Sequence, residues 1–144
     1  MSKLILSKGA VKYTCEATKR TWYVVFEPRR GEFRFWHLFT RSQFDHVWAY
    51  TALAHSTLIV VLNPSECLVE EWPLKAEEVA QFLPKDITAI LKFESKYSAI
   101  KHFVPRGGVN CVVMVKALLG LRGFALTPKG LYKQLVTMGA KHGR

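Results

Sequence analysis

The first two thirds of the chain carry short apolar runs separated by turn residues, which is the pattern of strands. Residues 21–26 are β-branched and aromatic, and a turn at residues 27–32 leads to a second such run at 33–39. We therefore predict that these two strands pair as a hairpin. Further strands are predicted at residues 44–50, 57–62, 67–72 and 88–93. The run 57–62 is apolar without a break, which is typical of a strand buried on both faces.

Helical spacing appears between and after these strands. Residues 73–83 have apolar positions on one helical face and end at Pro84, so they predict a short amphipathic helix. A second helix is predicted from residue 109 or 110 to about residue 119, with Gly120 as the glycine that ends it.

A last helix is predicted to begin at Thr127 and Pro128, as N-cap and first helical residue. The basic tail, residues 141–144, is expected to fray. Strands followed by helices indicate an α+β fold, an antiparallel sheet packed against helices.

Length and composition fit one domain over residues 1–144, with 49% hydrophobic residues available for a core. No apolar run approaches the roughly 18 residues of a membrane span. The first eight residues lack the apolar length of a signal peptide, so the cytoplasm is the expected location. The three cysteines match neither a disulfide framework nor a metal-binding spacing, and we predict no metal and no cofactor.

The charge is strongly positive, with 21 Lys and Arg against 11 Asp and Glu, a net +10. Such a balance favours polyanionic partners: nucleic acid, an acidic wall polymer or a membrane surface. No known DNA- or RNA-binding motif accompanies it. A polyanion partner is therefore a hypothesis that rests on charge alone.

The stretch from Arg106 to Cys111 suggests a catalytic site. Arg106, Gly107 and Gly108 lead into Cys111, which opens the predicted apolar helix. Unpaired N–H groups and partial positive charge at a helix N-terminus favour thiolate over thiol, so Cys111 is a candidate nucleophile. The alternative is a core cysteine, since free cysteine is among the most buried residue types.

A base for that thiol is predicted from the strand register. If residues 44–50 and 57–63 form a hairpin whose loop centres near residues 54 and 55, opposing residue numbers add up to about 109. His46 then lies opposite Asn63 on one face of the sheet, unless the register slips by one residue. His46 would act as the base and Asn63 would orient it. Taken singly, His46 is a packed strand histidine and Asn63 starts a turn.

Three residues are assigned to substrate binding. Arg106 suits a substrate carboxylate, Gly108 allows close approach of the backbone, and Trp48 follows His46 by two residues on the same strand. The alternative for Arg106 is a solvated loop arginine.

The order of these residues resembles a known family. Asp45-His46-Val47 on a strand, followed later in the chain by Asn110-Cys111 at a helix start, is similar to the circularly permuted, lecithin:retinol acyltransferase-like branch of the papain-like NlpC superfamily. Leu119-Gly120 and Thr127-Pro128 also resemble small phage-encoded proteins of this type.

That resemblance implies a permuted papain-like domain whose histidine strand precedes its cysteine helix. It implies a cysteine hydrolase or acyltransferase of the peptidase or amidase type, with Cys111, His46 and Asn63 acting on a peptide, amide or acyl substrate. The location would be the host cytoplasm or a virion. The alternative is a catalytically inactive fold of this type, serving as a basic binding or virion-associated module that contacts nucleic acid.

Overall fold

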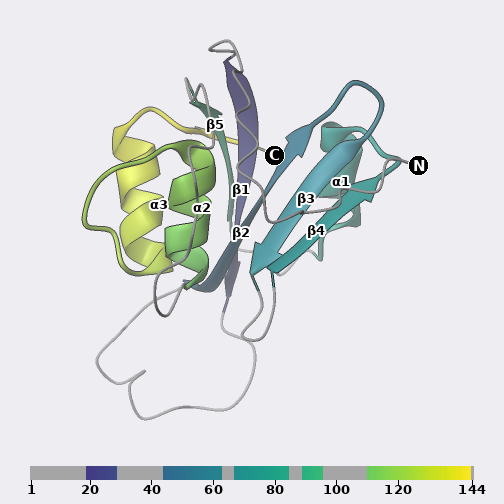
Figure 1. Cartoon of the computed structure of the whole chain (residues 1–144). Coiled ribbons are helices and arrows are strands. Elements are labelled where there is room, and N and C mark those ends of the chain that lie inside the picture. Colours follow the sequence, from purple (N-terminus) through teal and green to yellow (C-terminus); the bar gives the residue numbers. More distant parts are fainter. Residues whose placement is uncertain (1–18, 29–43, 63–66, 85–88, 96–109, 144) are drawn as a thin grey trace, which may run out of the picture.

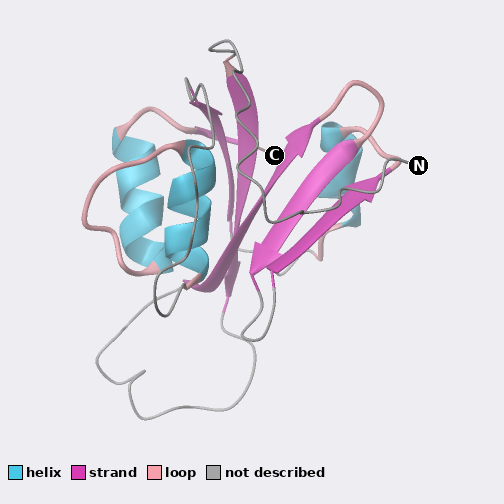
Figure 2. Ribbon diagram, viewed as in Figure 1, coloured by secondary structure: helices cyan, strands magenta, loops and turns pink. Residues whose placement is uncertain are grey.

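The computed structural model describes residues 19–28, 44–62, 67–84, 89–95 and 110–143. In this part of the chain, one six-stranded antiparallel sheet has the order β4-β3-β2-β1-β5-β6 and packs against three helices (Figures 1 and 2). The α+β class predicted from the sequence is confirmed. The elements are β1 (Arg20–Pro28), β2 (Phe44–Ala52), β3 (Thr57–Leu62), β4 (Cys67–Trp72), α1 (Ala76–Phe82), β5 (Ala89–Ser95), α2 (Cys111–Leu119), α3 (Pro128–Thr137) and β6 (Lys141–His142).

Strand β1 does not pair as predicted. It is antiparallel to β2 along one edge and to β5 along the other, so both of its edges are occupied. The predicted hairpin between β1 and residues 33–39 is therefore wrong, and residues 33–39 lie outside the described part of the chain. The partners of β1 come from later in the sequence, because its uninterrupted apolar run needs a central place in the sheet.

Helices cover both faces of the sheet. Helices α2 and α3 lie side by side on one face, and α1 lies on the other (Figures 1 and 2). We call these the α2–α3 face and the α1 face. Because successive residues of a strand point to opposite faces, each central strand contributes side chains to both layers.

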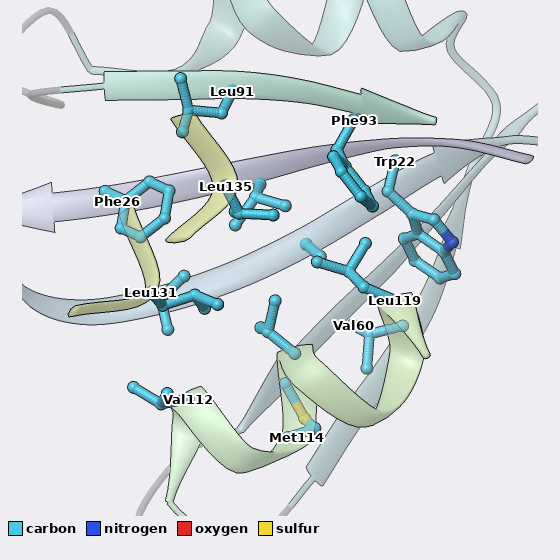
Figure 3. Close-up of a cluster of buried hydrophobic side chains, with 14 of the residues drawn as sticks. Trp22, Phe26, Val60, Leu91, Phe93, Val112, Met114, Leu119, Leu131 and Leu135 are labelled. Atoms are coloured by element: carbon cyan, nitrogen blue, oxygen red, sulfur yellow. The ribbon is translucent and has the colours of Figure 1, made fainter. Parts of the chain in front are cut away.

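The larger core lies on the α2–α3 face, where side chains of β1, β2, β3 and β5 meet those of both helices (Figure 3). Its strand residues are Trp22, Val24, Phe26, Phe44, Val47, Ala49, Val60, Leu91 and Phe93, and its helix residues are Val112, Met114, Val115, Leu119, Leu131 and Leu135. The smaller core on the α1 face contains Tyr23, Val25, Trp48, Tyr50, Ile59, Ile90, Ala76 and Val79. Apolar burial on both sides of one sheet fixes the positions of all three helices.

A β-bulge interrupts the regular alternation at the start of β2. Glu27 pairs with His46 whereas Pro28 pairs with Phe44, so Asp45 is an extra residue on β2. Proline has no N–H to donate to the ladder, which suits an irregular strand end. As a result Phe44 joins the α2–α3 face, where its ring centre lies 5.3 Å from that of Phe26.

The predicted ends of the last two helices are observed. The Asn110 side chain accepts from the Val113 N–H at 2.9 Å, and Gly120 ends α2 in the left-handed conformation with φ 64°. Thr127 caps α3 by accepting from the Gly130 N–H at 3.1 Å. The tail differs from the prediction, because Lys141 and His142 pair with β5 as the short strand β6.

The α3 helix offers a direct test of this packing. Leu135 is fully buried in the larger core, whereas its neighbour Val136 is 46% exposed. Leu135→Ala should lower the free energy of unfolding by about 2–5 kcal/mol, because it removes buried methyl groups and leaves a cavity. Val136→Ala should change it by about 0.5 kcal/mol or less. Urea unfolding of both variants measures this difference, and equal losses would contradict the assigned face of α3.

Candidate functional site

Cys111 is the first residue of α2, as the sequence predicts. Its side chain is partly buried and packs against the core of the α2–α3 face. The preceding Asn110 has a structural task, since its side chain caps the helix that Cys111 begins. The Asn-Cys pair thus places a thiol at a well-capped helix N-terminus.

Two opposed effects act on the thiol. Burial raises the pKa of Cys111, and backbone hydrogen bonds from Val47, Val112 and Cys111 itself lower it to a smaller extent. The net pKa of Cys111 lies above its ordinary value. The helix N-terminus therefore does not suffice to make this thiol a thiolate at neutral pH, because the loss of solvent outweighs it.

The structure does not bring His46 to this thiol. Val47 and Ala49 of β2 face α2, whereas Trp48 and Tyr50 belong to the α1 face. By alternation His46 lies with Trp48, and both line a pocket on the α1 face. The bulge at Asp45 precedes His46 and leaves it on that face. The predicted contact between His46 and Cys111 is wrong, because the sheet lies between the two side chains.

The pocket that contains His46 has a volume of about 290 Å³. It is lined by Glu27, His46, Trp48, Ile59, Val61, Leu68, Glu70, Trp72 and Leu83. Burial lowers the pKa of His46, and the nearby Glu27 carboxylate raises it to a smaller extent. Both partners of the predicted dyad are therefore shifted towards their neutral forms, the opposite of a thiolate–imidazolium pair. Trp48, predicted to bind substrate, is only 7% exposed and contributes mainly to the core.

The predicted register between β2 and β3 is confirmed for the four pairs next to the turn, from Ala49–Val60 to Ala52–Thr57. Ala49 pairs with Val60 and Ala52 with Thr57, so the numbers of each pair add up to 109. Asn63, Arg106 and Gly108, the other predicted site residues, lie outside the described part of the chain. The pairing of His46 with Asn63 stays a prediction, and the error concerns which face of the sheet the cysteine helix covers.

The remaining described histidines lie away from Cys111. His55 is exposed in the turn between β2 and β3, and His142 belongs to β6 at the far edge of the sheet. Within the described ranges, no group of three or more His, Cys, Asp or Glu side chains has the arrangement of a metal site. The same part of the chain contains no helix with the length and apolarity needed to cross a membrane.

A second candidate surface, at the loop between α2 and α3, is not predicted from the sequence. The loop between α2 and α3 carries Phe124 at 99% exposure and Leu126 at 70%. Arg122 in the loop and Lys129 and Lys133 on α3 are also exposed. The signal in the sequence was the pair of apolar residues between Gly123 and Thr127, in a stretch without acidic residues. Their exposure could not be read from a pattern, because the same residues suit a buried connection.

Comparison with protein-family models, with curated proteins and with solved structures finds no match for this chain. Function must therefore be argued from the site itself.

The state of Cys111 can be tested by alkylation. With a raised pKa, Cys111 should react with iodoacetamide at about pH 6 more slowly than glutathione does, and its rate should climb steadily into the alkaline range. His46→Ala should leave the rate unchanged, because His46 lies across the sheet. Site-resolved mass spectrometry separates Cys111 from Cys15 and Cys67. Fast labelling of Cys111 at acidic pH that becomes slower in His46→Ala would contradict this prediction and show that the two residues act as a dyad.

The burial of His46 predicts a pH dependence of stability. Its pKa in the folded chain lies below its ordinary value, so protonation favours the unfolded chain. The stabilising contribution is present above the ordinary pKa of about 6.5 and is lost as the pH falls from there through the lower pKa of the folded chain. Between about pH 7.5 and about pH 5.5, the wild type should lose more unfolding free energy than His46→Gln. Urea unfolding at the two pH values tests this, and equal losses would show that His46 does not contribute.

Proposed function

We propose that this chain is a binding module for a polyanionic partner, which it contacts through the layer formed by α2, α3 and the loop between them. One observation carries the proposal: every charged residue after Glu94 is basic. These nine residues are Lys96, Lys101, Arg106, Lys116, Arg122, Lys129, Lys133, Lys141 and Arg144. The net charge of +10 is thus distributed unequally along the chain.

In the folded chain, this unequal distribution of charge along the sequence becomes an unequal distribution of charge over the molecule. The α2–α3 layer carries Lys116, Arg122, Lys129 and Lys133 without any acidic residue. On the α1 face, Glu70 of β4 and Glu77 and Glu78 of α1 carry the opposite charge, and Glu71 lies on the outer strand β4. A field of one sign over one face attracts an anionic surface and orients the molecule as it approaches.

The start of α3 concentrates the positive potential. Acidic residues commonly occupy the first turn of a helix, where they oppose the helix dipole. The first turn of α3 has no acidic residue and carries Lys129 instead. One turn later, Lys133 lies on the same side of the helix, since residues four apart are neighbours on its surface. Binding of an anionic partner reduces the repulsion between these positive charges.

The alternative, a cysteine hydrolase or acyltransferase of the permuted papain-like type, rests on the resemblance in motif order. Strand β2 with His46 does precede helix α2 with Cys111. The hydrolase needs a base beside the thiol, however, and the placement of the two side chains on opposite faces favours the non-catalytic form. The permuted papain-like architecture, a peptide or acyl substrate and a cytoplasmic or virion location remain predictions from the sequence.

Two pairs of charge-removing variants test the binding module. Lys129→Gln with Lys133→Gln should weaken binding to heparin by about tenfold or more and reduce its salt dependence by about 1.5 in log–log slope. Lys75→Gln with Lys92→Gln removes the same charge from exposed positions elsewhere and should have a smaller effect. Heparin titrations at a series of salt concentrations measure both. Equal weakening by the two pairs, or no binding near physiological salt, would contradict the proposal.

A further inference from the structure

The loop between α2 and α3 has a defined conformation. Gly120 ends α2, and the Leu121 N–H donates to the Lys116 carbonyl at 2.8 Å. Leu121 and Ala125 pack inward against the core of the α2–α3 face. The loop is therefore anchored to the protein at two points on either side of Phe124.

Three carbonyl groups of the loop accept hydrogen bonds from the two helices. Lys116 Nζ donates to the carbonyl of Gly123 and to that of Ala125, and Gln134 Nε2 donates to the carbonyl of Arg122 at 2.7 Å. Gly123 has φ 128°, and a Cβ there would lie 3.0 Å from Gln134 Nε2. Glycine is required both by the backbone and by the closeness of that side chain.

The same anchoring turns two apolar side chains outward. Phe124 is 99% exposed and Leu126 is 70% exposed, while Ala125 between them packs inward. A single exposed apolar residue is ordinary on a protein surface. Two of them on a loop held by side chains of both flanking helices form a fixed apolar tip, which we define as Phe124 and Leu126.

Exposed cations stand beside this tip. Arg122 lies two residues before Phe124, and Lys129 lies three residues after Leu126. Lys116 donates hydrogen bonds to two loop carbonyls, so it stabilises the conformation of the loop that carries the tip. Apolar side chains flanked by cations combine the two forces that bind proteins to anionic membranes: transfer of apolar surface into the acyl region and attraction to acidic headgroups.

We propose that the polyanion bound by the α2–α3 layer is an anionic membrane surface, and that Phe124 and Leu126 insert into it while Arg122, Lys129 and Lys133 contact the headgroups. This inference rests on the proposed binding function and names its partner.

The character of the tip favours lipid over the other partners. Bases of nucleic acid stack on aromatic rings, and an aliphatic side chain such as Leu126 offers no such ring. A second copy using the same surface would place the basic layer against itself, so like charges would repel. An acyl layer accepts both an aromatic and an aliphatic side chain, and its acidic headgroups complement the cations.

The test compares two pairs of apolar truncations. Phe124→Ala with Leu126→Ala removes the tip, whereas Phe82→Ala with Val69→Ala removes exposed side chains, 69% and 60% exposed, from α1 and from the outer strand β4. Sedimentation with vesicles of phosphatidylcholine and phosphatidylserine should show at least about tenfold weaker binding for the first pair and little change for the second. Vesicles of phosphatidylcholine alone should bind the wild type weakly. Circular dichroism and urea unfolding confirm that both variants fold.

Heparin binding of the same variants separates the two proposals. If the tip variant binds heparin like the wild type but loses the vesicles, both proposals are supported. If the wild type binds heparin but not anionic vesicles, or if the tip variant binds vesicles unchanged, the membrane assignment is overturned and the polyanion-binding function stands. Tip-dependent binding of a single-stranded oligonucleotide in place of vesicles, or a tip-dependent dimer in sedimentation, would also overturn it. Absence of both heparin and vesicle binding would overturn the binding function itself.

Discussion

Burial of the central strands on both faces is the constraint on which this structure depends. Strands β1 and β2 each send alternate side chains into two separate cores, one closed by α2 and α3 and the other by α1. A residue of β2 is therefore assigned to a layer by its position alone, and two residues of opposite parity cannot meet. As a consequence, the backbone of Val47 forms a hydrogen bond with Cys111 on the α2–α3 face, whereas His46 lies on the α1 face.

The same constraint explains how far the sequence could be interpreted. The positions of β1 to β5, the caps of α2 and α3 and the register beside the β2–β3 turn follow from local patterns, and the sequence predicts them within a few residues. The face covered by α2 was not predictable in this way. Val47, Trp48, Ala49 and Tyr50 are all buried, so no alternation of polar and apolar residues marks one face of β2 as the side of the cysteine helix. The pairing of β1 with β5, from Phe26 with Ala89 to Arg20 with Ser95, joins segments far apart in the sequence and leaves no local signal either.

The two partly buried titratable groups, His46 and Cys111, illustrate how position decides chemistry. A helix N-terminus and a strand histidine are familiar parts of a cysteine enzyme, yet each here lies in its own apolar layer. Burial favours the neutral thiol and the neutral imidazole, so the residue types alone overstate their reactivity. The proposed function rests instead on the charges of the chain, which after Glu94 are all of one sign.

Strand β4 has a further consequence for the behaviour of many copies together. It is an outer strand of the sheet in the described part of the chain, and it carries Glu70 on one face and Glu71 on the other. Outer strands of two molecules tend to join into a continuous sheet, the first step towards aggregation, and charged side chains on such a strand oppose that contact. Copies of this chain gathered at high density on one surface would therefore resist joining edge to edge, even though crowding brings their sheets close together.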